Sequence, residues 1–336
     1  MSDWKKIKEK LPSEYFVDKI EPERKLRPEI CFVIIREVTE PVLARNSDPE
    51  RAEITVINNQ TRARINGEKF VSAERSTGLN LCRMVESKIN GSGSNRFNVI
   101  HSDYKYNEPL DKFDDALNPD SLIYGVVGTG EENYAIKSRV IEGYTYTTEP
   151  YDIINKEQHN ALYETGTMFK STREHGESLY THVNIEPPTK MVHFIRISTP
   201  TKEMVPYVLH NILNTTDYFA RSTRKGHIRN HLVGLIFSRG SIGLSTGEIL
   251  KEMGEQGEKE EQKLSIANLT DRVKKYVERH KNALWKEVWE DSFKDQGIND
   301  LVKLAKLEEG NSLDEFKGIL STITSQAKET YCPKKK

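Results

Sequence analysis

The sequence lacks a long hydrophobic run and has few cysteines. No apolar stretch in its 336 residues approaches the roughly 20 residues that a membrane-spanning helix needs. Its first residues are polar and lack the apolar centre of a secretion signal. Cys31, Cys82 and Cys332 are too far apart to suggest a disulfide framework or a four-cysteine zinc site. We therefore expect a cytoplasmic protein that makes no membrane contact.

The short motifs of nucleotide-binding and hydrolytic enzymes are also absent. There is no P-loop, no Gly-x-Ser-x-Gly elbow and no His-Glu-x-x-His helix. The glycines of Gly125–Gly130 do not have the dinucleotide-binding spacing and predict a turn. Histidines gather between residues 159 and 193, but none has zinc-ligand spacing beside cysteines. We expect no cofactor, no bound metal and no enzymatic activity.

The sequence does contain a basic segment inside an almost neutral chain. The net charge is -1, with 36% hydrophobic and 30% charged residues, which indicates a globular protein. Residues 190–239 nevertheless hold eight Lys and Arg against only Glu203 and Asp217. Such a segment indicates a polyanion-binding site, or else a solvated surface whose charges face different ways.

Hydrophobic patterning predicts an α+β protein. The continuous apolar run Ile30–Val38 predicts a strand buried on both faces. The β-branched run at 54–57, bounded by Asn58 and Asn59, predicts a hairpin-like excursion. Ser72 is the expected N-cap of a helix that reaches about residue 89, with Gly78 as its weak point. The other expected elements are strands at 137–146, 180–185, 191–197 and 231–237 and a helix ending near 213.

The order of these elements predicts a modified ferredoxin-like, or RNA-recognition-motif-like, core with insertions. After residue 245 the helical periodicity and dense mixed charge predict a C-terminal helical region. Trp285 and Trp289, four residues apart, are expected to form one buried helix face. The predicted organisation is an N-terminal arm at 1–28, a split core at 29–146 and 191–245, an insertion at 147–190 and a helical domain at 246–336.

Two basic groups are candidate phosphate sites. The first leads into the predicted helix of residues 72–89, whose N-terminal N–H groups would add to the attraction for an anion. The second lies in a glycine-containing loop with aromatic neighbours that offer stacking faces. Either group alone could be ordinary surface, but together they favour nucleic acid. The candidates are Arg62, Arg64, Lys69, Arg75 and Arg83 in the first group, and Arg221, Arg224, Lys225, His227 and Arg229 in the second.

From about Ile30 to Ser238 the sequence resembles the repeat-associated (RAMP) superfamily of CRISPR proteins. Within that superfamily it is most similar to the crRNA-binding backbone subunits of type I-D interference complexes. The carriers are Lys69–Arg75 at the start of the first core helix, the aromatic-glycine element Leu122–Gly125, the basic-Ser-Arg element Lys137–Val140, and the order of the residues from Tyr180 to Arg229.

The resemblance implies a ferredoxin-like core whose copies line up along a CRISPR RNA. It also implies a thumb-like insertion, located either at 40–66 or at 147–190, that leaves the guide bases free to pair with target DNA. Arg139 joins the RNA-binding candidates on this ground. The implied partners are crRNA, target DNA, further copies of the chain and other subunits of the complex. Because the histidine-rich insertion has no cysteines, a zinc site like that of some relatives is not expected.

Two enzymatic alternatives remain open. Some related backbone subunits cleave the target with a loop aspartate, and Asp48 in Asn46–Pro49 would be that residue. An Asp-Pro pair is more often only a turn. The other alternative is an RNA-processing endonuclease in which His227 is the general base.

Overall fold

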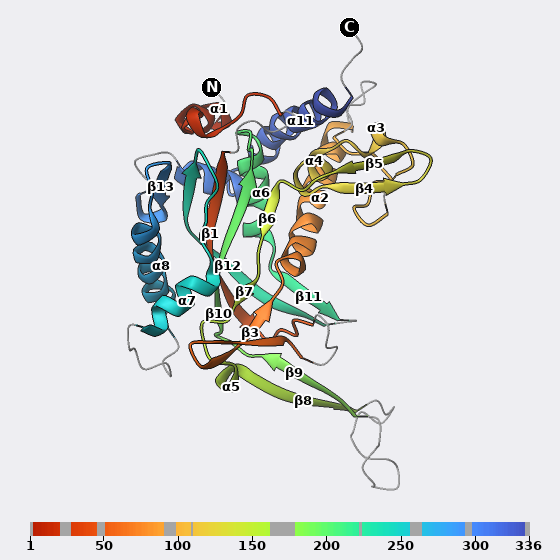
Figure 1. Cartoon of the computed structure of the whole chain (residues 1–336). Coiled ribbons are helices and arrows are strands. Elements are labelled where there is room, and N and C mark those ends of the chain that lie inside the picture. The colour runs from red at the N-terminus through yellow and green to blue at the C-terminus, as the bar shows by residue number, and fades with distance from the viewer. Residues whose placement is uncertain are drawn as a thin grey trace.

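A computed structural model describes residues 3–20, 28–45, 51–90, 99–108, 110–161, 179–221, 224–255, 264–292 and 298–332. These residues form a curled antiparallel sheet with helices on both faces and smaller sheets around it (Figure 1). The mixture of helices and strands confirms the predicted α+β class.

Among the described residues, six strands form the central sheet. They are β1 (Glu29–Glu40), β6 (Val140–Glu142), β10 (Lys190–Ser198), β11 (Asp217–Arg221), β12 (Arg224–Ser238) and β13 (Trp285–Trp289). Their order is β11-β12-β1-β10-β6, with β13 also pairing with β12. All neighbours are antiparallel, so β6 runs parallel to β1 with β10 between them. Ile30–Ile35 of β1 is fully buried, as its continuous apolar run predicted.

Each face of the sheet has its own hydrophobic core, because successive β1 side chains point to opposite faces. Phe32 and Ile34 pack in one core, and Val33 and Ile35 in the other. The first core contains α1 (Asp3–Lys10), α2 (Glu68–Asn90), α4 (Pro119–Tyr124), α6 (Met204–Asn214), α10 (Ile298–Ala305) and α11 (Ser312–Tyr331). The second contains α7 (Thr246–Glu255) and α8 (Ile266–His280).

Hairpins extend the fold beyond the central sheet. The predicted hairpin around 54–57 is confirmed, and Asn58 and Asn59 turn it with positive φ angles of 52° and 59°. The peripheral strands are β2 (Glu53–Ile57), β3 (Gln60–Ile65) and β7 (Thr145–Tyr146) in one sheet, β4 (Val126–Thr129) with β5 (Asn133–Ile136), and β8 (Asn155–Ala161) with β9 (Leu179–Ile185). Two short helices, α3 (Phe113–Ala116) and α5 (Tyr151–Ile154), lie between them in sequence.

The start of α2 differs from the prediction that Ser72 caps this helix. The helix begins at Glu68, whose backbone N–H donates to Asn66 Oδ1 at 3.2 Å. Gly78 does not weaken the helix, because it lies where α2 crosses α6. A Cβ atom at Gly78 would come within 2.5 Å of Tyr207 Oη. The glycine therefore permits the close contact of the two helices.

Two strand predictions also need correction. The expected continuous strand at 137–146 is divided between β6 of the central sheet and β7 of a peripheral one. Trp285 and Trp289 lie in β13, not in a helix, and pair with Ser238 and Gly234 of β12. A spacing of four residues places two side chains on one face in either structure. The spacing therefore fits a helix and a strand equally well. Here the segment is a strand because it pairs with β12.

Within the part of the chain that the structure describes, no helix is long and apolar enough to cross a membrane. Over the same residues, no group of three or more His, Cys, Asp and Glu side chains could hold a metal ion. Cys31 and Cys82 are buried free thiols, and burial raises the pKa of both. Asp48, the candidate nuclease residue, lies outside the described residues.

Candidate nucleic-acid interface

Three segments that are distant in sequence meet in one groove of about 520 Å³. The first turns of α2 form one wall, the end of α4 and the loop at Tyr106 form another, and the segment entering β6 completes it. Lys69–Arg75, Leu122–Gly125 and Lys137–Val140, three of the four segments that carry the family resemblance, contribute to this groove. The lining residues are Glu68, Val71, Ser72, Arg75, Tyr106, Tyr124, Lys137, Ser138, Val140, Ile141 and Glu142.

Arg75 is fixed in the wall of this groove. Its Nε and Nη2 donate to the two carboxylate oxygens of Asp120 at 3.0 and 2.6 Å, and Nη2 also donates to the Gly125 carbonyl at 2.9 Å. Its guanidinium lies over Tyr106 at 4.5 Å and over Tyr124 at 5.6 Å. Burial alone would lower the Arg75 pKa, but the bonds to Asp120 raise it. Arg75 therefore organises the groove, and Asp120 balances its charge.

The groove lining contains two cations, Arg75, which pairs with Asp120, and Lys137, and two carboxylates, Glu68 and Glu142. Lys69 and Lys137 are exposed, one on the first turn of α2 and one in the segment before β6. The expected free N–H groups at the start of α2 are occupied instead. The amides of Lys69 and Phe70 donate to the carbonyls of Asn66 and Gly67. Within the groove, an anion would meet the Lys137 ammonium group and the Ser72–Tyr106 hydroxyl pair, whose oxygens are 2.8 Å apart, with the exposed Glu68 carboxylate beside them.

A buried ionic network lies beneath the groove and includes Glu142 of its lining. Arg36 is fully buried and donates from Nη1 to Glu74 Oε1 at 2.8 Å, and its Nη2 is 3.6 Å from Glu142 Oε2. Burial, followed by the charge of Glu74, raises the pKa of Glu142 well above its ordinary value. The raised pKa favours the neutral form of Glu142, which weakens the repulsion that this carboxylate would exert on an anion in the groove.

His193 completes the network. Its Nδ1 accepts from Arg36 Nε at 3.0 Å, so Nε2 carries the proton and donates to the Gly143 carbonyl at 3.2 Å. Burial, and then the charge of Arg36, lower the pKa of His193 well below its ordinary value. Because Arg36 is in β1, Glu74 in α2 and His193 in β10, this network fixes α2 on the sheet.

The second basic group lies on the hairpin of β11 and β12, next to the start of α2. Phe70 packs against Tyr218 and Phe219 of β11 with ring centroids 5.5 and 5.2 Å apart. Arg229 is exposed, and the half-buried His227 ring contacts the Thr39 hydroxyl. The backbone pairs Arg221 with Arg224, and the side chains of Arg221, Arg224 and Lys225 lie outside the described ones. The fold thus brings the two basic groups onto adjoining elements.

The other predicted residues are distributed differently. Arg62 and Arg139 are only 5% and 1% exposed, and Arg62 Nη1 donates to the Thr147 carbonyl at 3.1 Å. These two guanidiniums are interior, and we do not include them in the interface. Arg64 is part-exposed, pairs with Glu53 and lies 5.0 Å over the Tyr144 ring. Arg83 is exposed farther along α2 and donates to the Tyr104 carbonyl at 3.2 Å.

Sequence reasoning missed two important residues. Tyr106 lies in a turn-rich stretch without periodicity, so nothing in the pattern singles it out. Arg36 had a usable signal, because a charged residue inside the apolar run Ile30–Val38 requires a buried partner.

The fold and groove define an α+β protein with a groove lined by charged and aromatic side chains. The model of the Csc2 CRISPR family matches residues 30–313, and the chain belongs to this family. It is similar to the crystal structure of Thermofilum pendens Csc2, with a TM-score of 0.57, 13% identity, and coverage of 89% of this chain and 88% of that chain.

Two further solved structures show weaker similarity. A CRISPR RNA-guided surveillance complex in a pre-nicking state gives a TM-score of 0.44 at 7% identity, covering 76% of this chain and 88% of that chain. A type IV-B CRISPR complex gives a TM-score of 0.39 at 12% identity, covering 69% of this chain and 100% of that chain. A comparison with curated protein sequences finds no match.

Proposed function

We propose that this chain is the crRNA-binding backbone subunit of a type I-D, Cascade-like CRISPR interference complex. The observation that carries the proposal is the convergence of three family-like segments on one groove, with Lys137 in its lining and the exposed Lys69 on the adjoining first turn of α2. The β11–β12 hairpin, which carries the second basic group, packs against Phe70 of the same helix α2. Membership of the Csc2 CRISPR family supports the biological context.

The strand order supports a RAMP-type, ferredoxin-like core. Taking β1, β6, β10 and β12 as its four strands, the sheet order is fourth, first, third, second. Helix α2 follows the first strand and α6 follows the third, which is the βαββαβ arrangement. We assign the thumb to the β8–β9 hairpin, which projects from the body of the molecule in Figure 1, whereas β2–β3 packs against β7.

The chemistry of the groove favours recognition of the RNA backbone over recognition of base sequence. Lysine ammonium groups attract phosphates of any sequence, and the half-buried Tyr106 is the ring of the groove on which a base could stack, because Tyr124 is buried. A guide held in this way keeps its base edges free to pair with target DNA. Further copies of the chain and other subunits would complete the cytoplasmic ribonucleoprotein. The chain itself is proposed to be non-enzymatic.

The test is charge reversal at the groove. Lys69→Glu with Lys137→Glu should weaken binding of single-stranded RNA at least about tenfold, whatever its sequence, because phosphate contacts dominate affinity. The control is Lys317→Glu with Lys328→Glu, the same charge change at exposed positions of α11. Fluorescence anisotropy with a labelled oligonucleotide measures both. Equal affinity of the two double variants, or no RNA binding by the wild-type chain, would contradict the proposal.

A further inference from the structure

The groove at the start of α2, which we call the α2 groove, suits the uncharged part of a nucleotide better than its phosphate. Val71, Tyr106, Val140 and Ile141 supply apolar surface to its lining. Its volume of about 520 Å³ lies within the roughly 300–1,000 Å³ of pockets that take small molecules, a class that includes a base joined to a sugar. The carboxylates of the lining would repel a phosphate inside the groove, but they would not repel a base or a sugar.

Tyr106 offers a fixed ring to a base. The guanidinium of Arg75 lies over this ring at 4.5 Å, and the hydrogen bonds to Asp120 hold Arg75 in place. Tyr106 Oη and Ser72 Oγ are 2.8 Å apart, so the hydroxyl end of the ring is held as well. Tyr106 is half-buried, and Ile141 of the same lining is 37% exposed. A base can therefore contact this ring without the entropic cost of ordering a free tyrosine side chain.

Glu68 gives the α2 groove an acceptor for a sugar hydroxyl. It is the first residue of α2 and is exposed, and its Oε2 accepts from Asn66 Nδ2 at 3.4 Å. A carboxylate has about four lone-pair sites, so it can accept a further hydrogen bond. The 2′-hydroxyl of ribose is a donor that deoxyribose lacks. This carboxylate therefore disfavours phosphate but favours a ribose sugar.

Close packing at the start of α2 holds Glu68 at the groove. A Cβ atom at Gly67 would come within 2.5 Å of the Glu142 carbonyl and 2.6 Å of the Gly143 carbonyl, so glycine lets α2 begin directly beside the end of β6. The Glu142 side chain is only 1% exposed and faces Arg36. Among the described residues of the lining, Glu68 is therefore the carboxylate that a ligand can reach.

Lys137 of the lining and the exposed Lys69 on the first turn of α2 supply cations for the phosphates that flank a bound nucleoside. We propose that the α2 groove binds one nucleotide of a single-stranded RNA, with its base on Tyr106 and its 2′-hydroxyl donating to Glu68. Glu68 is then the residue by which this groove distinguishes RNA from DNA. The inference rests on the proposed RNA-binding function and specifies which part of the RNA the groove takes.

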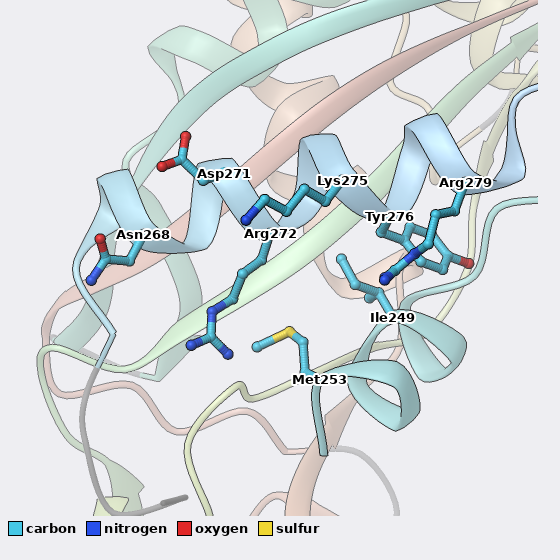
Figure 2. A pocket seen from close by; sticks show the side chains of 8 residues that line it. All are labelled: Ile249, Met253, Asn268, Asp271, Arg272, Lys275, Tyr276 and Arg279. Carbon is cyan, nitrogen blue, oxygen red and sulfur yellow. The ribbon is translucent and has the colours of Figure 1, made fainter. Parts of the chain in front are cut away.

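A second groove, between α7 and α8, supplies the control (Figure 2). Its volume of about 210 Å³ is below the roughly 300 Å³ at which small-molecule pockets begin. Arg279 in its lining is paired with Glu252 of α7. Asp271 is an exposed acidic residue of the same lining. Asp271→Ala therefore removes one carboxylate from a groove, as Glu68→Ala does, but from a groove that we do not assign to RNA.

The first experiment compares three single-stranded oligonucleotides of one sequence: RNA, DNA, and RNA with 2′-fluoro sugars, which keep an RNA-like conformation but have no hydroxyl to donate. The wild-type chain should bind the RNA at least about fivefold more tightly than either of the others. In Glu68→Ala the three affinities should become nearly equal. Asp271→Ala should keep the wild-type preference. Fluorescence anisotropy measures the affinities.

The second experiment tests the base. An RNA that carries one 2-aminopurine, placed at each position in turn, should lose fluorescence on binding where that base stacks on the ring. Tyr106→Phe keeps the ring and should keep both the quenching and the affinity, whereas Tyr106→Leu should lose the quenching and lower the affinity at least about fivefold. Circular dichroism shows that the variants compared are folded.

Equal binding of RNA and DNA by the wild type would overturn the inference. So would a Glu68→Ala variant that binds all three oligonucleotides more tightly with an unchanged preference for RNA, because Glu68 would then only repel phosphate. Adenosine monophosphate that binds as tightly as the RNA would show a pocket for a free nucleotide instead. If the wild type binds RNA without preference and Lys69→Glu with Lys137→Glu still weakens binding, the proposed function stands and only this inference fails. If the wild type binds no RNA, both fail.

Discussion

At the scale of single residues, the basic side chains of this chain are of two kinds, buried and exposed. Arg36 and His193 are buried and paired inside the sheet, where their role is to hold α2 in place. Arg229 and Lys69 remain exposed, where phosphate can reach them. Sequence alone predicts both kinds as equally basic, because burial of a cation depends on partners that only the fold brings near.

The protonation of His193 gives a prediction of pH dependence. Because the folded chain binds this proton more weakly than the unfolded chain does, His193 lowers stability as the pH falls below its ordinary pKa of 6.5. The loss should approach about 1.4 kcal/mol per pH unit. His193→Gln keeps an acceptor for Arg36 and does not titrate. Urea unfolding at about pH 7.5 and about pH 5.5 should therefore show the variant losing less stability than the wild type.

One outcome of the urea experiment would contradict the predicted effect of His193 on the pH dependence of stability. If the difference in unfolding free energy between wild type and His193→Gln is the same at both pH values, this histidine does not change protonation on folding. The buried network beneath the groove would then be wrongly described.

At the scale of elements, the sequence predicted most of the central sheet. The strands expected at Ile30–Val38, 191–197 and 231–237 lie in the central sheet, and the hairpin at 54–57 lies in a peripheral one, because their apolar and β-branched runs are clear. The break between β6 and β7 and the β13 strand were not foreseen. Each depends on which neighbouring edge is available for pairing, and a single segment carries no record of that edge.

The close contact of α2 and α6 gives a prediction at this scale. Gly78→Ala should destabilise the fold by about 1–3 kcal/mol, because the added methyl group would meet Tyr207 and Asn211 at 2.5–2.7 Å. Intrinsic helix propensity alone predicts the opposite sign, since alanine is favoured over glycine by up to about 1 kcal/mol. Urea unfolding of the variant and the wild type measures the change.

The matched control is Gly318→Ala in α11, where nothing lies within 4 Å of the added atom. That change should stabilise the chain by up to about 1 kcal/mol. If Gly78→Ala is as stabilising as Gly318→Ala, the packing of α2 on α6 is not as tight as described.

At the scale of the whole molecule, the near-zero net charge conceals a separation of charge. Lys69, Lys137 and Arg229 are exposed on or beside α2 and on β12, whereas most charged residues of 103–133 are acidic. The charge count over 190–239 predicted the hairpin as a basic site. The packing of that hairpin against Phe70 of α2 could not be predicted, because it depends on contacts between segments far apart in the sequence.

Photochemical cross-linking of bound single-stranded RNA, with the attached peptides identified by mass spectrometry, tests the central claim most directly. We expect the wild-type chain to form cross-links with RNA of any sequence. The cross-linked peptides should contain Lys69–Arg75, Tyr106, Lys137 and residues 218–229. Cross-links confined to α7, α8, α3 or the β4–β5 hairpin, with none at the start of α2 or on the β11–β12 hairpin, would contradict the proposed RNA-binding surface.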